Sequence, residues 1–164
     1  MTRLARRFRW FLPAVAAAGI CLSPATVASA STENPYELLV GKWGGNGIMT
    51  LEGGRKERIK CDATYSGGAS QLALSINCRG GENEVKMSAK LSANQGRLLG
   101  IWEEKINRVA GSISGVATKN RINFSIMGVV TGTMNVTYSK TRQKVDITAR
   151  GVPLQTVSMN MTRR

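Results

Sequence analysis

The chain has 164 residues, with 23 Lys and Arg, 10 Asp and Glu and no histidine, which gives a formal charge of +13. This length fits one domain with a single core, and the lack of histidine removes the commonest metal ligand and the usual general base near neutral pH. Aromatic residues make up only 5%, which argues against a single-strand nucleic-acid binder, because such proteins need an exposed stacking platform.

Residues 1–30 predict a secretory signal peptide. Four arginines in the first nine residues precede an apolar run over 10–22, and Ala-Ser-Ala occupies 28–30. A basic start, a short apolar segment and a small-x-small ending are the three parts of such a signal, and the apolar run is too short for a transmembrane helix. We expect cleavage after Ala30 and a periplasmic or secreted mature chain, with 19 basic and 10 acidic side chains and a formal charge of +9.

Residues 31–40 are expected to form a leader, and 41–164 a single β domain. After a Gly-rich run over 41–51 and a turn at 52–55, two alternating runs flank a Gly-rich turn between Lys56 and Arg79. Pairing residues whose numbers sum to 139 places Cys61 opposite Cys78, at the separation that a disulfide tolerates. Signal cleavage leaves only these two cysteines in an oxidising compartment, so we predict a disulfide rather than two buried thiols.

About ten short runs with period-two alternation cover 41–164, with turn signals between them. No pattern for a crossover helix is visible, so the expected fold is an antiparallel up-and-down meander that closes into a barrel. Closure is expected because an open sheet of ten strands would expose two long edges. The alternative fold is a two-sheet sandwich, which the same alternation permits. Expected cross-strand neighbours are Trp43 with Tyr65, Trp102 with Met87, and Phe124 with Gly115.

Two candidate binding sites follow from this register. The inward aromatic residues near an expected cavity, which would hold an apolar or anionic ligand, are Trp43, Tyr65, Trp102 and Phe124. Alternate turns of a meander share one end, and there they gather the cations Arg97, Lys119, Arg121, Lys140, Arg142 and Lys144. This end is a predicted anion-binding surface for anionic envelope material, and the alternative is that these side chains only solvate the turns.

The titratable residues predict no enzyme, no metal and no cofactor. Asp62 and Asp146 fall on outward positions, and bridged cysteines leave no thiolate nucleophile. Glu57 and Glu104 fall on inward positions near turns of one end, where they would form a carboxylate pair. The favoured alternative is that they are rim residues in ion pairs with Arg55, Lys105 or Arg108.

The tripeptide Gly41-Lys42-Trp43, preceded by Glu37-Leu38-Leu39 and followed by antiparallel strands, resembles the calycin group of small exported barrels. That group contains lipocalins, avidins and bacterial metalloprotease inhibitors, and in it the tryptophan plugs one end of the barrel. The resemblance covers the first third of the mature chain, which is longer than the inhibitors and has a second Gly-x-Trp at Gly100-Ile101-Trp102.

The expected function is therefore non-catalytic binding at the cell envelope, of an apolar or anionic ligand at the barrel mouth or of anionic envelope material. The inhibitors carry a leader, an early disulfide and an export signal, so the resemblance also implies an alternative. In it a periplasmic protease is inhibited by Ser31, Thr32 and Glu33. Nucleic-acid binding and a membrane span are not expected.

Overall fold

The protein folds into ten antiparallel strands, as seen in a computed structural model that describes Asn34 and residues 36–164. The predicted signal peptide and leader residues 31–33 lie outside these described residues. The strands are β1 (Gly41–Leu51), β2 (Lys56–Gly68), β3 (Gln71–Gly80), β4 (Asn83–Asn94), β5 (Arg97–Glu104), β6 (Val109–Thr118), β7 (Arg121–Gly128), β8 (Thr131–Tyr138), β9 (Arg142–Arg150) and β10 (Leu154–Arg163).

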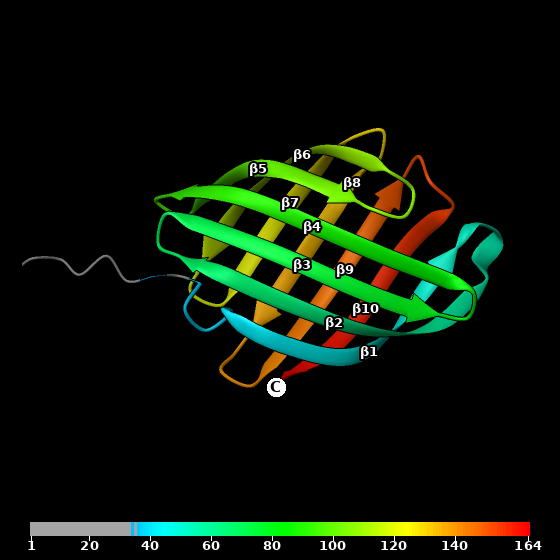
Figure 1. The fold of residues 1–164 in the computed structure, drawn as a ribbon, viewed down its shortest axis with the longest axis horizontal. Coiled ribbons are helices and arrows are strands. Elements are labelled where there is room, and N and C mark those ends of the chain that lie inside the picture. Colours follow the sequence, from blue (N-terminus) through cyan, green and yellow to red (C-terminus); the bar gives the residue numbers. More distant parts are fainter. Residues whose placement is uncertain (1–33, 35) are drawn as a thin grey trace, which may run out of the picture. The chain divides into compact units, whose positions relative to one another are not determined.

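Each strand pairs with the next one in sequence, and β10 pairs with β1, which closes the sheet into a barrel (Figure 1). The predicted meander and its closure are confirmed, and the two-sheet alternative is excluded. Alternating side chains point into the barrel and form one core, as expected where one face of every strand is buried.

The two ends of the barrel differ. At the closed end lie the turns β2–β3, β4–β5, β6–β7 and β8–β9, with the segment before β1 and the end of β10. At the other end, called the mouth, lie the turns β1–β2, β3–β4, β5–β6, β7–β8 and β9–β10.

The segment before β1 plugs the closed end. Tyr36 and Leu39 are fully buried, and Trp43 is 1% exposed. The indole Nε1 of Trp43 donates to the Leu39 carbonyl oxygen at 2.7 Å. The Arg163 guanidinium covers the same ring, so the start and the end of the barrel are tied together here.

The predicted disulfide is present. Cys61 and Cys78 are direct partners across β2 and β3, and their Sγ atoms are bonded. The bridge therefore staples the hairpin that follows the first strand.

Two expected cross-strand pairs were wrong by two residues. Trp43 faces Ala63 rather than Tyr65, and Trp102 faces Ala89 rather than Met87. A shift of two keeps every side chain on its face, so alternation alone does not detect it. In the first case the turn decides the register: residues 52–54 form a 3-10 turn in which Gly53 has a φ of 78°. The expected pair of Phe124 with Gly115 is confirmed.

Candidate ligand-binding site

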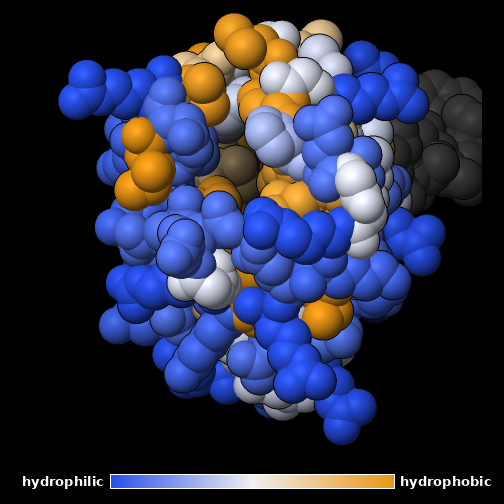
Figure 2. Space-filling view, turned by 90° about the vertical axis from the view of Figure 1, so that its right-hand side faces the viewer, coloured by the Kyte–Doolittle hydropathy of each residue, from blue (hydrophilic) through white to orange (hydrophobic). Residues whose placement is uncertain are grey.

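A cavity of about 390 Å³ opens at the mouth of the barrel, within the range of about 300 to 1,000 Å³ that small-molecule sites occupy. Figure 2 views the barrel from this end and shows the hollow. Most of its lining is aliphatic or thioether side chains, among them Met49, Ile59, Ile76, Met87, Ile126, Val130, Ile147, Leu154, Val157 and Met159.

Two inward residues towards the mouth of β8 and β9 are small, although most of the cavity lining is large and apolar. Gly132 on β8 faces Ala149 on β9, so neither strand fills the space between them with a large side chain. At the closed end, by contrast, the inward residues Tyr36, Trp43 and Tyr65 are all nearly or fully buried. The plug residues thus occupy the closed end, and the cavity lies at the other end.

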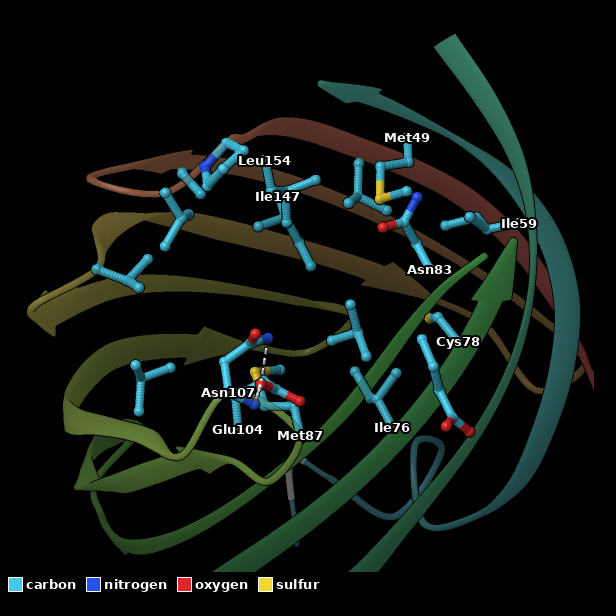
Figure 3. A pocket seen from close by; sticks show the side chains of 18 of the residues that line it. Met49, Ile59, Ile76, Cys78, Asn83, Met87, Glu104, Asn107, Ile147 and Leu154 are labelled. Atoms are coloured by element: carbon cyan, nitrogen blue, oxygen red, sulfur yellow. Dashed lines mark hydrogen bonds between the residues drawn. The ribbon is translucent and has the colours of Figure 1, made fainter. Parts of the chain in front are cut away.

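Glu104 is the buried charged residue of the cavity, at 7% exposure. One carboxylate oxygen accepts from the backbone N–H groups of Lys86 and Ile106, both at 3.0 Å. The other oxygen accepts from the backbone N–H of Asn107 at 2.7 Å and from its side-chain amide at 2.8 Å. Figure 3 shows Glu104 and Asn107 bonded to each other, with Met87 beside them.

These hydrogen bonds keep Glu104 ionised. Burial by itself raises the pKa of a carboxyl group, but the donors from Asn107, Ile106 and Lys86 outweigh it, so the pKa of Glu104 lies below its ordinary value. The four donors occupy the lone pairs of both oxygens. Glu104 therefore anchors the β5–β6 turn and has no free lone pair for a ligand.

Glu84 is the other charged residue of the lining. It accepts from Arg79 and Lys86, each at 3.1 Å, and these hydrogen bonds lower its pKa. No lysine or arginine is part of the cavity lining among the described residues. The cavity is thus mostly apolar. Its two carboxylates already bind donors of the protein, and its described lining contains no lysine or arginine.

The expected carboxylate pair does not form. Glu57 is outside the cavity lining, and its carboxylate binds Arg55 at 3.2 Å and the side-chain amide of Asn83 at 2.8 Å. This is the alternative expected for Glu57. Glu104 differs from both expectations, because its partners are N–H groups of Lys86 on β4 and of the turn residues Ile106 and Asn107, not the side chains of Lys105 or Arg108.

The four aromatic residues singled out from the sequence are not brought together at the mouth. Trp102 lines the cavity and is 5% exposed, with its Nε1 pointing to the Met127 carbonyl oxygen at 3.4 Å. Trp43 and Tyr65 are buried towards the closed end, where Gln143 donates to the Tyr65 hydroxyl at 2.7 Å. Phe124 is buried against Gly115. The methionines that line the cavity were missed, although they stand at inward positions of the same alternating pattern.

The six predicted anion-binding cations lie at the closed end, away from the cavity. All six are exposed. Lys144 pairs with Asp146 at 2.9 Å, whereas Arg97, Lys119, Arg121, Lys140 and Arg142 take part in no ion pair among the described residues. An anionic ligand held by these residues would therefore not be in the cavity.

The described part of the chain has neither a membrane-spanning helix nor a cluster of metal ligands. None of its helices is long and apolar enough to span a bilayer. Nor does this part contain three or more His, Cys, Asp or Glu grouped so that they could hold a metal ion.

Comparison with known proteins identifies the fold. The sequence matches no protein-family model and no curated protein. Among solved structures, the chain is similar to the S-type phycobiliprotein lyase CPES from Guillardia theta, with a TM-score of 0.58 and 10% identity over 79% of this chain and 89% of that chain. It is also similar to Rv2717c from M. tuberculosis, with a TM-score of 0.60 and 13% identity over 78% of this chain and 94% of that chain.

Both are ten-stranded barrels of the calycin/lipocalin-like fold, so the resemblance expected from Gly41-Lys42-Trp43 is confirmed at the level of the fold. The expectation that the protein is not an enzyme is corrected by the same comparison. One barrel of this fold is named a lyase, so the lack of histidine and of a free thiol does not assign a chain with this fold to a non-catalytic class.

Proposed function

We propose that the protein binds an uncharged apolar small molecule in the mouth cavity. The observation that carries this proposal is a cavity of about 390 Å³ whose lining, among the residues that the structure describes, includes no lysine or arginine. The likeness to a barrel named as a phycobiliprotein lyase supports a role in which a small molecule occupies the barrel. The ligand is proposed here from the lining alone.

The charges of the lining argue against an anionic ligand inside the cavity, which was one of the two ligand classes expected from the sequence. Burying a carboxylate without a cation or spare hydrogen-bond donors is costly. Glu84 and Glu104 are already bound to donors of the protein, so neither offers a partner to the carboxylate of a ligand. An alcohol or hydrocarbon avoids this cost.

The first test is binding of the uncharged fluorescent probe N-phenyl-1-naphthylamine. Ala149 points into the cavity, so Ala149→Phe is expected to weaken probe binding by about tenfold or more by filling the space. Thr148→Phe, its outward neighbour on β9, is the matched control and should bind like the wild type. A folded Ala149→Phe variant that binds as well as the wild type, or a wild type that does not bind, would contradict the proposal.

The second test compares two competitors of equal chain length. Dodecanol is expected to displace the probe at a concentration about tenfold lower than dodecanoate, because only the carboxylate must be buried unpaired. If both compounds displace the probe at the same concentration, the proposed preference for uncharged ligands is wrong, but binding in the cavity is not contradicted.

We further propose that the protein acts outside the cytoplasm, with residues 1–30 as a signal peptide, 31–40 as a leader and 41–164 as the binding domain. The disulfide supports this location, because such bonds persist in oxidising compartments. Mass spectrometry of the exported protein should find an N-terminus at Ser31. Retention of the first 30 residues would contradict export by this signal.

A second candidate function is docking of the closed end on anionic envelope material. It is favoured by the five exposed cations there that form no ion pair among the described residues. Retention on such material should fall at high ionic strength and on replacement of Lys119 and Arg121 by Gln. Inhibition of a periplasmic protease through residues 31–33 stays a separate proposal, and deletion of these residues would abolish that inhibition.

A further inference from the structure

Apolar side chains on the outside of the barrel gather on one side of the mouth. Six of the eight exposed large hydrophobic residues of the described chain lie between positions 99 and 129. Four of these form what we call the apolar lip: Ile101 on β5, Ile106 in the β5–β6 turn, Met127 on β7 and Val129 in the β7–β8 turn. Val129 is 73% exposed and Ile101 is 67% exposed. Figure 2 shows hydrophobic side chains gathered along the upper edge of the hollow.

The lip lies close to the cavity. Ile101 and Met127 stand in one cross-strand row, because both are partners of Ser112 on β6. Ile106 and Val129 extend this row into the two neighbouring turns of the mouth. The residue after Val129 is Val130, which lines the cavity. Apolar side chains are therefore found on the outer wall, at the rim and, from Val130 inwards, in the lining of the cavity.

Unpaired cations border the lip. Arg108 follows Ile106 in the same turn, and Arg150 is the register partner of Thr131, close to Val129. The next residue, Gly151, approaches Val129 so closely that an added Cβ would lie 2.6 Å from the Val129 carbonyl oxygen. Both arginines are exposed, and neither forms an ion pair with any described residue.

The carboxylates of the mouth lie mainly on the other side. Glu52, Glu57, Glu82 and Glu84 belong to the β1–β2 and β3–β4 turns and their flanks. Near the lip, Glu103 pairs with Lys105 at 3.6 Å and accepts from Ser88 at 2.8 Å. The rim is thus divided into a side with many acids and a side that is apolar and basic.

We propose that the apolar lip docks the mouth of the barrel on the surface of an anionic lipid bilayer. Apolar side chains at the tips of turns can insert at the headgroup boundary, and adjacent arginines attract anionic headgroups. A second copy of the chain fits this side less well, because a face-to-face dimer would bring Arg108 and Arg150 of both copies into one interface. Docking rests on the proposed function in one respect: it gives an apolar ligand a route between bilayer and cavity that avoids water.

The test is cosedimentation with vesicles of equal parts phosphatidylcholine and phosphatidylglycerol, compared with pure phosphatidylcholine. The Ile106→Asp, Val129→Asp double variant is expected to lose binding to the mixed vesicles by about tenfold or more, because two exposed apolar side chains that would insert into the bilayer are replaced by anions. Ile48→Asp is the matched control, since Ile48 is an exposed apolar residue of β1 outside the lip, at 40% exposure. It should lower binding much less.

The cations are tested in the same assay. Replacing Arg108 and Arg150 by Gln is expected to weaken binding to mixed vesicles by about fivefold for each charge and to leave pure phosphatidylcholine unaffected. The control pair is Lys119→Gln with Arg121→Gln, which removes the same charge from the closed end. If this control loses more binding than the mouth variant, the closed end docks and the proposal is overturned.

Two further measurements, probe binding and sedimentation velocity, distinguish failure of the docking proposal from failure of the proposed function. N-phenyl-1-naphthylamine binding in solution reports the cavity, so a lip variant that binds the probe but not vesicles supports docking with an intact site. A wild type that binds the probe and ignores anionic vesicles overturns docking and leaves the proposed function standing. Sedimentation velocity reports association: if the lip variants change the oligomeric state while vesicle binding is unchanged, a second copy covers the lip and the proposal is wrong.

Discussion

The guanidinium of Arg163 lies 4.6 Å from the centroid of the Trp43 ring and joins the last strand of the barrel to the first. The same group donates to the backbone carbonyl oxygens of Leu38 and Val40 in the segment before β1, and its Nε donates to the carbonyl oxygen of Lys140 at 2.8 Å. One side chain therefore holds the plug, the first strand and the β8–β9 turn together.

Replacing Arg163 by Gln is expected to lower the free energy of unfolding by about 2 to 4 kcal/mol, because several carbonyls lose a charged donor and the ring loses its cation. Arg164→Gln is the control. Arg164 pairs with Asp62 at 2.7 Å with both side chains about half exposed, so its loss should cost less than about 1 kcal/mol. Urea unfolding measures both, and equal losses would show that Arg163 has no special role.

Glu104 is expected to make stability depend on pH. Its folded pKa is depressed, so its contribution is present above the unfolded value of about 4.3 and is lost as pH falls through the lower folded value. Glu104→Gln should cost about 1 to 3 kcal/mol at pH 7, because an amide places a donor against N–H groups. Urea unfolding at several pH values should show this difference shrinking in acid. A difference that stays constant with pH would mean that Glu104 acts through packing alone.

Lys60 and Arg79 form a like-charge pair on the outer face of the stapled hairpin, where they are direct cross-strand partners. Lys60→Glu is expected to raise the free energy of unfolding by about 0.2 to 1 kcal/mol, because opposed charges replace repulsion. Lys90→Glu changes the net charge equally but faces Ala73 and Ile101, so it should give no such gain. Thermal unfolding at low salt compares the two, and identical shifts would indicate an effect of net charge only.

The disulfide between Cys61 and Cys78 closes a separation of 17 residues. Replacing both cysteines by Ala is expected to lower the free energy of unfolding by about 3 kcal/mol, chiefly because the unfolded chain gains freedom. The wild type unfolded under reducing conditions should behave like this variant. If the variant matches the oxidised wild type instead, the bridge is unnecessary for stability.

The sequence by itself determined which residues face inward, because period-two alternation is a local property of each strand. It also determined the disulfide, since the turn between Gly68 and Gln71 is short and leaves little choice of register. The count of strands and their antiparallel order followed from turn signals, and closure followed from the cost of two open edges.

Tertiary structure alone decided the remaining features. Registers across β1–β2 and β4–β5 differ by two from those expected, since a shift of two leaves the inward face unchanged and depends on the geometry of the turn. The cavity lies at the mouth end, with Ala149 in its lining, and its position depends on how the side-chain volumes of all ten strands add up around the barrel axis. The sequence predicted a rim carboxylate at Glu104 and missed its partners. These are the backbone N–H groups of Lys86, Ile106 and Asn107 and the Asn107 side-chain amide, whose positions are set only when β4, β5 and β6 are in place.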